Sequence, residues 1–172
     1  MTKIIAGFPG IGEECLRNFD FNQFINAKTA ILNPDFPQNY INAIKAEIGK
    51  LNIIYVSSHK IIRDALRENN IKYILVYPAK RLKLEYIYRC SKGGCDFNFI
   101  KFLYYNWDIL INEIEEETFP TKLKLWDGEE LNDIFIKDYC SFYKEFCSIK
   151  ETNADEYEGN PCSGCKIRQK LC

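Results

Sequence analysis

The residues best suited to chemistry form a glycine-rich turn close to the N-terminus. The turn follows a short apolar run and leads into a segment of helical character; its residues are Gly7, Phe8, Pro9, Gly10, Ile11, Gly12, Glu13, Glu14 and Cys15. Gly7 and Gly12 have the spacing of the Walker pattern G-x-x-x-x-G-K-[S/T], whose backbone N–H groups and following helix N-terminus hold phosphates. Glu13 stands at the lysine position of that pattern, and Glu14 at the position of the Mg²⁺-binding hydroxyl. The sequence therefore predicts a phosphate-binding turn that lacks the usual cation and metal ligand.

The two glutamates oppose the usual way in which such a turn binds a triphosphate. Replacing lysine by glutamate reverses the local charge, and one contact between unit charges is worth roughly 4 kcal/mol at a surface-like dielectric. Three interpretations remain open. The turn binds ATP with Mg²⁺ or another phosphate ligand in an altered pose, or Glu13 caps the N–H groups of the turn itself. In the third, the segment is an ordinary strand–turn–helix, because acidic residues favour the first turn of a helix.

Other polar residues are expected near this turn because they follow neighbouring apolar runs. His59, the only histidine, is a candidate general base or phosphate contact, although a polar strand end bonded to backbone is favoured. Arg81, Arg89 and Lys92 form either an anion-gripping lid or one solvated helix face. Arg81, Arg89 and Asp20 are the candidate catalytic residues, with Asp20 as an acceptor-site carboxylate.

The cysteines crowd the last third of the chain. Of eight in total, five lie there: Cys140, Cys147, Cys162, Cys165 and Cys172. Cys162 and Cys165 have the spacing of a zinc half-site, and the other three are candidates for the remaining ligands. An iron–sulfur cluster fits the same ligands, and free or redox-active thiols and disulfides are the alternatives.

The hydrophobic pattern alternates between buried strands and amphipathic helices. Strands are expected over residues 2–7, 51–56, 73–77 and 122–125, and helices over 12–18, 38–50, 60–69, 80–92, 97–117 and 131–146. Residues 19–25 read as a short helix or an edge strand, and 30–32 as a brief buried strand. The long helix is expected to turn one apolar stripe inward: Phe99, Ile100, Leu103, Trp107, Leu110, Ile111 and Ile114. The alternation implies an α/β fold with a parallel sheet, whose carboxyl edge collects the turn, residues 57–59 and residues 78–81.

Four segments together give the chain a family resemblance. They are the turn, Asn33-Pro34-Asp35-Phe36-Pro37-Gln38-Asn39-Tyr40, Val56-Ser57-Ser58-His59 and Leu75-Val76-Tyr77-Pro78. Over most of residues 1–135 the chain resembles the small P-loop proteins of phages and prophages that are similar to adenylate-kinase-type nucleoside monophosphate kinases. The resemblance implies a three-layer P-loop kinase-like fold, a parallel sheet flanked by helices with a small helical lid over the phosphates.

The resemblance also locates the departures from that family. The family's lysine and hydroxyl, which hold the triphosphate, correspond to Glu13 and Glu14. Arg89 matches a lid-helix arginine, whereas Gly93 stands where a second arginine is expected. Asp20 is what remains of the Asp/Ser-rich segment that follows the first helix. The resemblance therefore implies a retained scaffold with lost kinase chemistry.

Length and composition bound these interpretations. A chain of 172 residues with 47% hydrophobic residues predicts one domain, which we expect over 1–147, with a cysteine-rich tail over 148–172. The resemblance implies a lid within this domain at about 80–96. A net charge of −1 implies no bulk attraction to nucleic acid. No apolar run approaches the ~20 residues of a membrane span, so we expect a cytoplasmic protein.

The expected function is that of a P-loop protein that binds a nucleotide or phosphorylated small molecule, with impaired or lost phosphoryl transfer. Two alternatives stay open. One is an active nucleotide or small-molecule kinase that uses a non-standard cation. The other is a structural or interaction protein that acts through its cysteine-rich tail, for which zinc is the candidate metal.

Overall fold

The protein is built on a five-stranded parallel sheet. The computed structural model describes residues 2–11, 22–24, 32–51, 53–129 and 131. The strands are β1 (Lys3–Gly7), β2 (Asn22–Phe24), β3 (Ile53–Ser57), β4 (Ile74–Pro78) and β5 (Thr121–Leu125), in the order β2-β3-β1-β4-β5. Every pairing is parallel, which confirms the α/β class.

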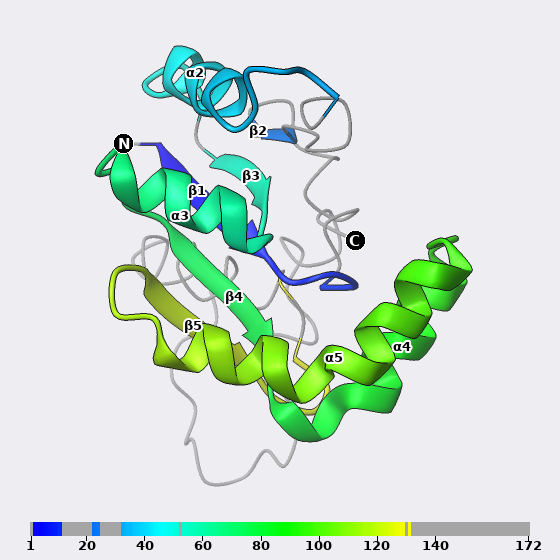
Figure 1. Cartoon of the computed structure of the whole chain (residues 1–172). Coiled ribbons are helices and arrows are strands. Elements are labelled where there is room, and N and C mark those ends of the chain that lie inside the picture. The colour runs from blue at the N-terminus through cyan, green and yellow to red at the C-terminus, as the bar shows by residue number, and fades with distance from the viewer. Residues whose placement is uncertain (1, 12–21, 25–31, 52, 130, 132–172) are drawn as a thin grey trace, which may run out of the picture.

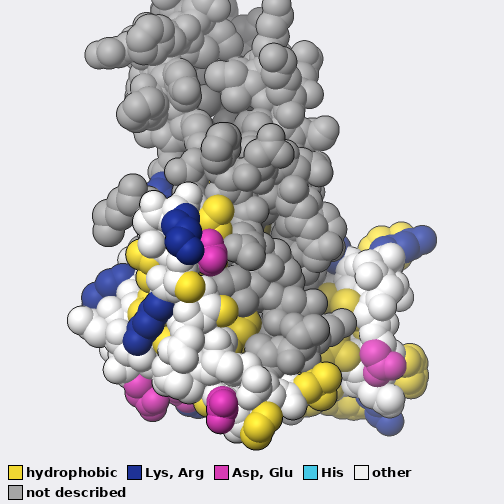
Figure 2. All heavy atoms as spheres, turned by 90° about the horizontal axis from the view of Figure 1, so that it is seen from above, with side chains coloured by type: hydrophobic (Ala, Val, Ile, Leu, Met, Phe, Trp, Pro, Cys, Tyr) yellow, Lys and Arg dark blue, Asp and Glu magenta, His cyan; other side chains and the backbone are white. Residues whose placement is uncertain are grey.

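Four α-helices and one short 3₁₀ helix are described. They are α2 (Gln38–Glu47), α3 (Lys60–Glu68), η2 (Lys80–Leu82), α4 (Lys83–Lys92) and α5 (Phe97–Glu116). Helices α3 and α5 cross the same face of the sheet, and α4 runs beside α5 as a hairpin that extends past the sheet (Figure 1). The same hairpin forms the projection at the right of the space-filling view (Figure 2). The helices predicted over 12–18 and 131–146 lie outside the described residues apart from Leu131, so the three-layer arrangement stays a prediction.

Most boundaries agree with the sequence prediction, and the differences have local causes. Helix α2 ends at Glu47, three residues early, because Gly49 takes a left-handed φ of 90°. Ile48, which continues the apolar spacing of Ile41 and Ile44, therefore lies beyond the helix and is 45% exposed. Strand β2 confirms the strand alternative for the region around residue 22. The buried strand predicted over 30–32 is wrong at Leu32, which lies in a turn and is 85% exposed.

The long helix follows its predicted pattern with one exception. Asp96 caps its N-terminus by accepting hydrogen bonds from the N–H groups of Asn98 and Phe99. The stripe buries Leu103, Trp107, Ile111 and Ile114, with Ile100 and Leu110 partly buried against the core. Phe99 was expected inward and is 37% exposed, because it lies on the flank of the stripe beside the helix end. In the part of the chain that is described, no helix is both long and apolar enough to cross a membrane.

The strand order makes the end of β1 the natural place for a ligand. β1 is the central strand, with β3 on one side and β4 on the other. The chain leaves β1 towards β2 and leaves β4 towards β5, so the two connections diverge. In open parallel sheets, ligands bind where adjacent connections diverge at the carboxyl edge. The candidate ligand site is therefore at the carboxyl ends of β1 and β4.

Candidate functional site

The first element of the site is the loop that follows β1, here called the β1 loop and comprising Gly7 to Ile11. Phe8 and Ile11 are buried, whereas Pro9 and Gly10 are half-buried. The N–H of Phe8 donates to the carbonyl of Val76 at 2.9 Å, which ties the loop to β4. The predicted ligand residues Gly12, Glu13, Glu14 and Cys15 lie outside the described residues.

Both described glycines of the loop lie where a side chain would not fit. A Cβ on Gly7 would stand 1.7 Å from the hydroxyl oxygen of Tyr55, which is buried on β3. Gly10 has a φ of 77°, and a Cβ there would lie 3.1 Å from the Sγ of Cys90 and 3.5 Å from the carbonyl of Tyr86. Helix α4 therefore packs directly against the β1 loop, and only glycine permits that approach.

An aromatic cluster fixes the loop to the helical hairpin. The ring of Phe8 makes an edge contact with Trp107 at 5.3 Å between centroids, and Tyr86 lies 6.0 Å from Trp107. The Nε1–H of Trp107 donates to the carbonyl of Lys80 at 2.7 Å. Trp107 is fully buried, so the prediction that it belongs to the core is confirmed. One side chain thus joins α5, η2 and the β1 loop.

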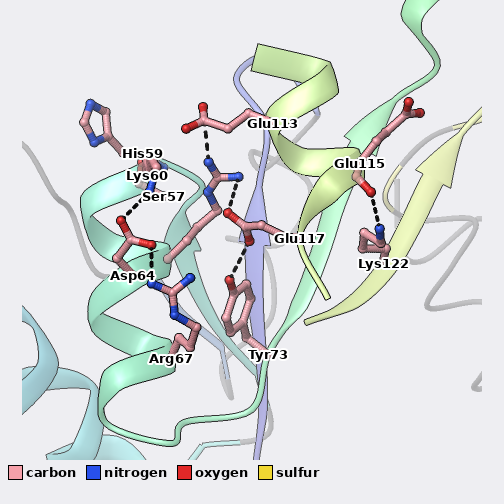
Figure 3. Close-up of polar contacts among 11 residues, drawn as sticks. Ser57, His59, Lys60, Asp64, Arg67, Tyr73, Glu113, Glu115, Glu117 and Lys122 are labelled. Atoms are coloured by element: carbon pink, nitrogen blue, oxygen red, sulfur yellow. Dashed lines mark hydrogen bonds and ion pairs between the residues drawn. The ribbon is translucent and has the colours of Figure 1, made fainter. Parts of the chain in front are cut away.

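At the end of β3, the hydrogen bonds that the structure shows are donated by backbone N–H groups. The N–H of Ser57 donates to the Tyr40 hydroxyl at 3.4 Å, and the N–H of His59 donates to the Ser57 Oγ at 3.2 Å. Burial is the main influence on Tyr40 and raises the pKa of its hydroxyl. The imidazole of His59 is exposed and points away from α5 (Figure 3). His59 is the N-cap residue of α3 and makes no side-chain cap hydrogen bond, so both interpretations of this side chain stay predictions.

The arginines predicted for the lid lie at different places along the hairpin. Arg89 is beside the β1 loop, since its Cβ is 3.6 Å from the position of a Cβ on Gly10. Its Nη2 pairs with Glu85 at 2.5 Å. Arg81 instead turns towards the end of β5, where its Nε and Nη2 donate to Asp127 at 3.0 and 2.5 Å. The structure therefore brings Arg89, and not Arg81, to the β1 loop.

Lys92, the third member of that set, lies in the last turn of α4. Its Nζ is 5.6 Å from the ring centroid of Tyr88. It is exposed and therefore belongs to the outer surface of the hairpin. Asp20, the remaining candidate catalytic residue, lies outside the described residues.

Sequence reasoning missed a cation–aromatic group at the end of β5. Trp126 is 47% exposed, with the Arg81 guanidinium 5.0 Å from its ring centroid and the Lys124 Nζ 5.7 Å away. A hydrogen bond with Glu115 is the largest influence on Lys124 and raises the pKa of its ammonium group. The sequence could have indicated this group through the position of Trp126, which directly follows a predicted strand and therefore lies at the carboxyl edge of the sheet.

A second missed feature is the buried guanidinium of Arg63, between α3 and α5 (Figure 3). Arg63 is 3% exposed; its Nη1 is 3.1 Å from the Glu117 Oε1, and its Nη2 is 3.7 Å from the Glu113 Oε2. The Tyr73 hydroxyl donates to the Glu117 Oε2 at 3.2 Å. Burial first, then the Glu117 charge, raises the pKa of Tyr73, which keeps it a donor. No pattern in a single sequence pairs α3 with α5, so this network could not be foreseen.

An open pocket of about 280 Å³ lies beside that network. Its lining comprises Lys60, Arg67, Tyr73, Glu113, Glu116, Glu117, Thr118 and Phe119. Both cations of the lining are already paired with Asp64. We therefore regard the pocket as a consequence of the charged α3–α5 contact, and the β1 loop as the better ligand site.

No metal centre is present in the described part of the chain, where no group of three His, Cys, Asp or Glu side chains is arranged to hold an ion. Cys90 is buried, Cys95 is half-buried, and neither forms a disulfide. The zinc prediction rests on Cys162 and Cys165, with Cys140, Cys147 and Cys172, and all five lie outside the described residues.

Comparison with protein families and with curated proteins adds no relative. No protein-family model matches the chain, and no curated protein matches it. Functional inference therefore depends on the geometry of the site.

Proposed function

We propose that the chain binds a nucleotide or another phosphorylated small molecule at the β1 loop, on a P-loop kinase-like scaffold with impaired or lost phosphoryl transfer. The observation that carries the proposal is the position of this glycine-containing loop. It follows the central strand, borders the divergence between β1 and β4, and has an arginine on its flank.

The ligand class follows from the groups available at the loop. Pro9 has no N–H and the N–H of Phe8 donates to Val76, so within the described loop the N–H groups left for an anion are those of Gly10 and Ile11. Gly10 is half-buried with a left-handed φ of 77°, and successive N–H groups in such a conformation favour anions. Arg89 offers planar, forked donors that suit a phosphate, and it would exchange Glu85 for the ligand.

Impaired phosphoryl transfer follows from the sequence of the same loop. Efficient transfer needs a cation on the β- and γ-phosphates and a ligand for Mg²⁺, and the corresponding positions carry Glu13 and Glu14. Arg89, whose Cβ lies beside Gly10, already pairs with Glu85. The alternative of an active kinase rests on this same arginine as its non-standard cation.

The test is isothermal titration of the full chain with ATP and Mg²⁺. We expect the native protein to bind and Arg89→Gln to bind about tenfold to a hundredfold more weakly, as for loss of a charged hydrogen bond. Arg67→Gln is the matched control, because Arg67 also pairs with a carboxylate on its own helix but lies on α3. It should bind like the native chain.

A double variant, Glu13→Lys/Glu14→Ser, separates the possible failures. Binding by this variant alone would refute the proposal, because it would show a loop whose ligand is excluded by charge. ATP turnover by the native chain on addition of nucleoside monophosphates would replace the proposal by the active-kinase alternative. If neither chain binds nucleotide, the cysteine-rich tail becomes the leading site.

A further inference from the structure

The α4–α5 hairpin carries an unusual concentration of exposed apolar side chains. Eight of the twelve large hydrophobic residues that are exposed in the described part of the chain lie on these two helices. We call the following set the aromatic face: Leu84, Tyr88, Phe97, Phe102, Tyr104, Tyr105 and Ile109. Phe97 and Tyr105 are the most open of its rings, at 75% and 71% exposure. Scattered apolar residues need no explanation, but a gathering of this kind marks an interaction surface.

Three lysines of the hairpin have no acidic partner among the residues that the structure describes. Lys83, Lys92 and Lys101 form no ion pair with any described residue, whereas Lys80, Arg81 and Arg89 each have one. The Nζ of Lys83 is 4.3 Å from the ring centroid of Tyr104, and that of Lys92 is 5.6 Å from the ring centroid of Tyr88. In Figure 2 the hairpin accordingly shows hydrophobic side chains with basic ones beside them.

The charge of the hairpin is unevenly distributed. Residues 80–101 hold six Lys or Arg and two Asp or Glu, which gives +4, whereas residues 102–116 hold four Asp or Glu and no Lys or Arg, which gives −4. The hairpin as a whole is therefore neutral, and an anionic partner is favoured only beside its basic part, residues 80–101.

We propose that the aromatic face binds single-stranded nucleic acid. Exposed rings stack on bases of any sequence, and unpaired lysines beside them contact the phosphates between those bases. The members of the face on α5 (Phe97–Glu116) run from Phe97 to Ile109, so along this helix the face is about 18 Å long. The net charge of −1 argues only against attraction between nucleic acid and the chain as a whole. Local contacts between phosphates and the lysines beside the aromatic face remain compatible with it.

The same observations weigh against two other occupants. A second copy of the chain would bring the three unpaired lysines of each hairpin towards those of its partner. An anionic membrane would take up two phenylalanines and the two aliphatic side chains, Leu84 and Ile109, but it would also have to accommodate three phenol hydroxyls. The rings suit stacking better than either. The proposal is independent of nucleotide binding at the β1 loop.

The stacking half of the proposal is tested with a fluorescein-labelled oligothymidylate and the full chain, by fluorescence anisotropy. We expect saturable binding, and Tyr105→Ala and Phe97→Ala each to weaken it roughly fivefold to a hundredfold, as for loss of one stacked base. Both side chains are largely exposed, so circular dichroism should show an unchanged fold. Ile61→Ala, which removes a 48% exposed side chain from α3, is the matched control and should bind like the native chain.

The electrostatic half is tested by salt. Contacts from three lysines predict a fall in affinity of about twentyfold between roughly 50 and 200 mM salt. The triple variant Lys83→Gln/Lys92→Gln/Lys101→Gln should lose most of that dependence. A control triple variant at Lys45, Lys50 and Lys60, on or beside α2 and α3, should keep it.

Several results would overturn the proposal. They are the absence of an anisotropy change at low salt, or binding that the two alanine variants leave intact. A mass of twice 20.2 kDa in light scattering, reduced to one copy by Tyr105→Ala, would assign the face to a second copy. Binding to vesicles that contain phosphatidylserine, without binding to the oligonucleotide, would assign it to a membrane surface.

Discussion

The buried guanidinium of Arg63 allows a quantitative prediction about what holds α3 against α5. Glu117→Gln keeps the size of the side chain and an acceptor for the Tyr73 hydroxyl, but it removes the charge 3.1 Å from the Arg63 Nη1. Arg63 then remains 3% exposed, with only Glu113, at 3.7 Å and one-third exposed, to balance its charge. We expect Glu117→Gln to destabilise the protein strongly.

The magnitude follows from opposing terms. At an effective dielectric near 20, unit charges 3.1 Å apart attract by about 5 kcal/mol, and the desolvation of both groups offsets much of this attraction. Removal of one partner of a buried ion pair costs about 3–5 kcal/mol, because the other charge is left unbalanced. Glu113 still offers partial balance, so we expect the lower end, about 3 kcal/mol. In a chain of this size the midpoint of thermal unfolding should fall by about 6–12 °C.

The informative comparison is with Arg63→Met. This variant removes the most deeply buried charge, and the Nε of Arg63 has no hydrogen-bond partner among the described residues. Glu117 keeps the hydrogen bond from Tyr73 and is 15% exposed, so it can gain solvent. We expect Arg63→Met to lower the free energy of unfolding by only about 1–2 kcal/mol, less than Glu117→Gln does.

Urea denaturation followed by circular dichroism measures both variants and the double variant. The double variant should resemble Arg63→Met, because Glu117 matters chiefly while the guanidinium is present. The reasoning is refuted if Glu117→Gln costs less than about 0.5 kcal/mol, which is typical of an exposed pair. It is equally refuted if Arg63→Met proves the more destabilising of the two.

Two further predictions concern the aromatic cluster and the surface of α3. Trp107→Phe keeps a ring but leaves the carbonyl of Lys80 without its donor, so we expect the free energy of unfolding in urea to fall by about 1–3 kcal/mol. Asp64 accepts a hydrogen bond from Lys60, and this bond chiefly lowers the pKa of Asp64. Because the pKa of Asp64 is lower in the folded protein than in the unfolded chain, ionised Asp64 stabilises the fold at pH values above its unfolded pKa, about 3.9. This stabilisation is lost as the pH falls through the folded pKa. Asp64→Asn should therefore melt below the native chain at neutral pH, with the difference disappearing in acid.

Each of these has a result that contradicts it. A Trp107→Phe variant as stable as the native chain would mean that the hydrogen bond to Lys80 contributes nothing. A constant difference in melting temperature between Asp64→Asn and the native chain, from neutral to acidic pH, would mean that ionisation of Asp64 is not what stabilises α3.

The core of the fold was predictable because its signals are local. Buried runs such as residues 53–57 and 74–78 leave little choice but a central parallel strand, and their alternation with helices fixes the class. Errors arose where the pattern continues past the element. Ile48 and Phe99 fit the apolar periodicity, yet the left-handed Gly49 and the cap at Asp96 place them at helix ends, where the periodicity no longer determines burial.

The site was only partly predictable because its contacts are not local. The β1 loop and Arg89 were both found from the sequence, and the structure brings them together. Arg81 appeared equivalent to Arg89, but its position one helix earlier directs it to Asp127. The network of Arg63 depends on helices some fifty residues apart, so its members appear in the sequence as ordinary surface charges.

The glycines of the β1 loop are weaker evidence for a phosphate ligand than their spacing suggests. Gly7 is required by the hydroxyl of Tyr55, and Gly10 by its left-handed backbone and the approach of α4. Both residues would be needed in a protein with this packing even if no ligand bound. A substitution such as Gly10→Ala would therefore reduce stability and any ligand binding together, and could not separate the two roles. Arg89 has no such ambiguity, because its guanidinium is held by a carboxylate on its own helix. A loss of binding in Arg89→Gln without a loss of stability is thus the result that would distinguish a retained phosphate site from an inherited turn.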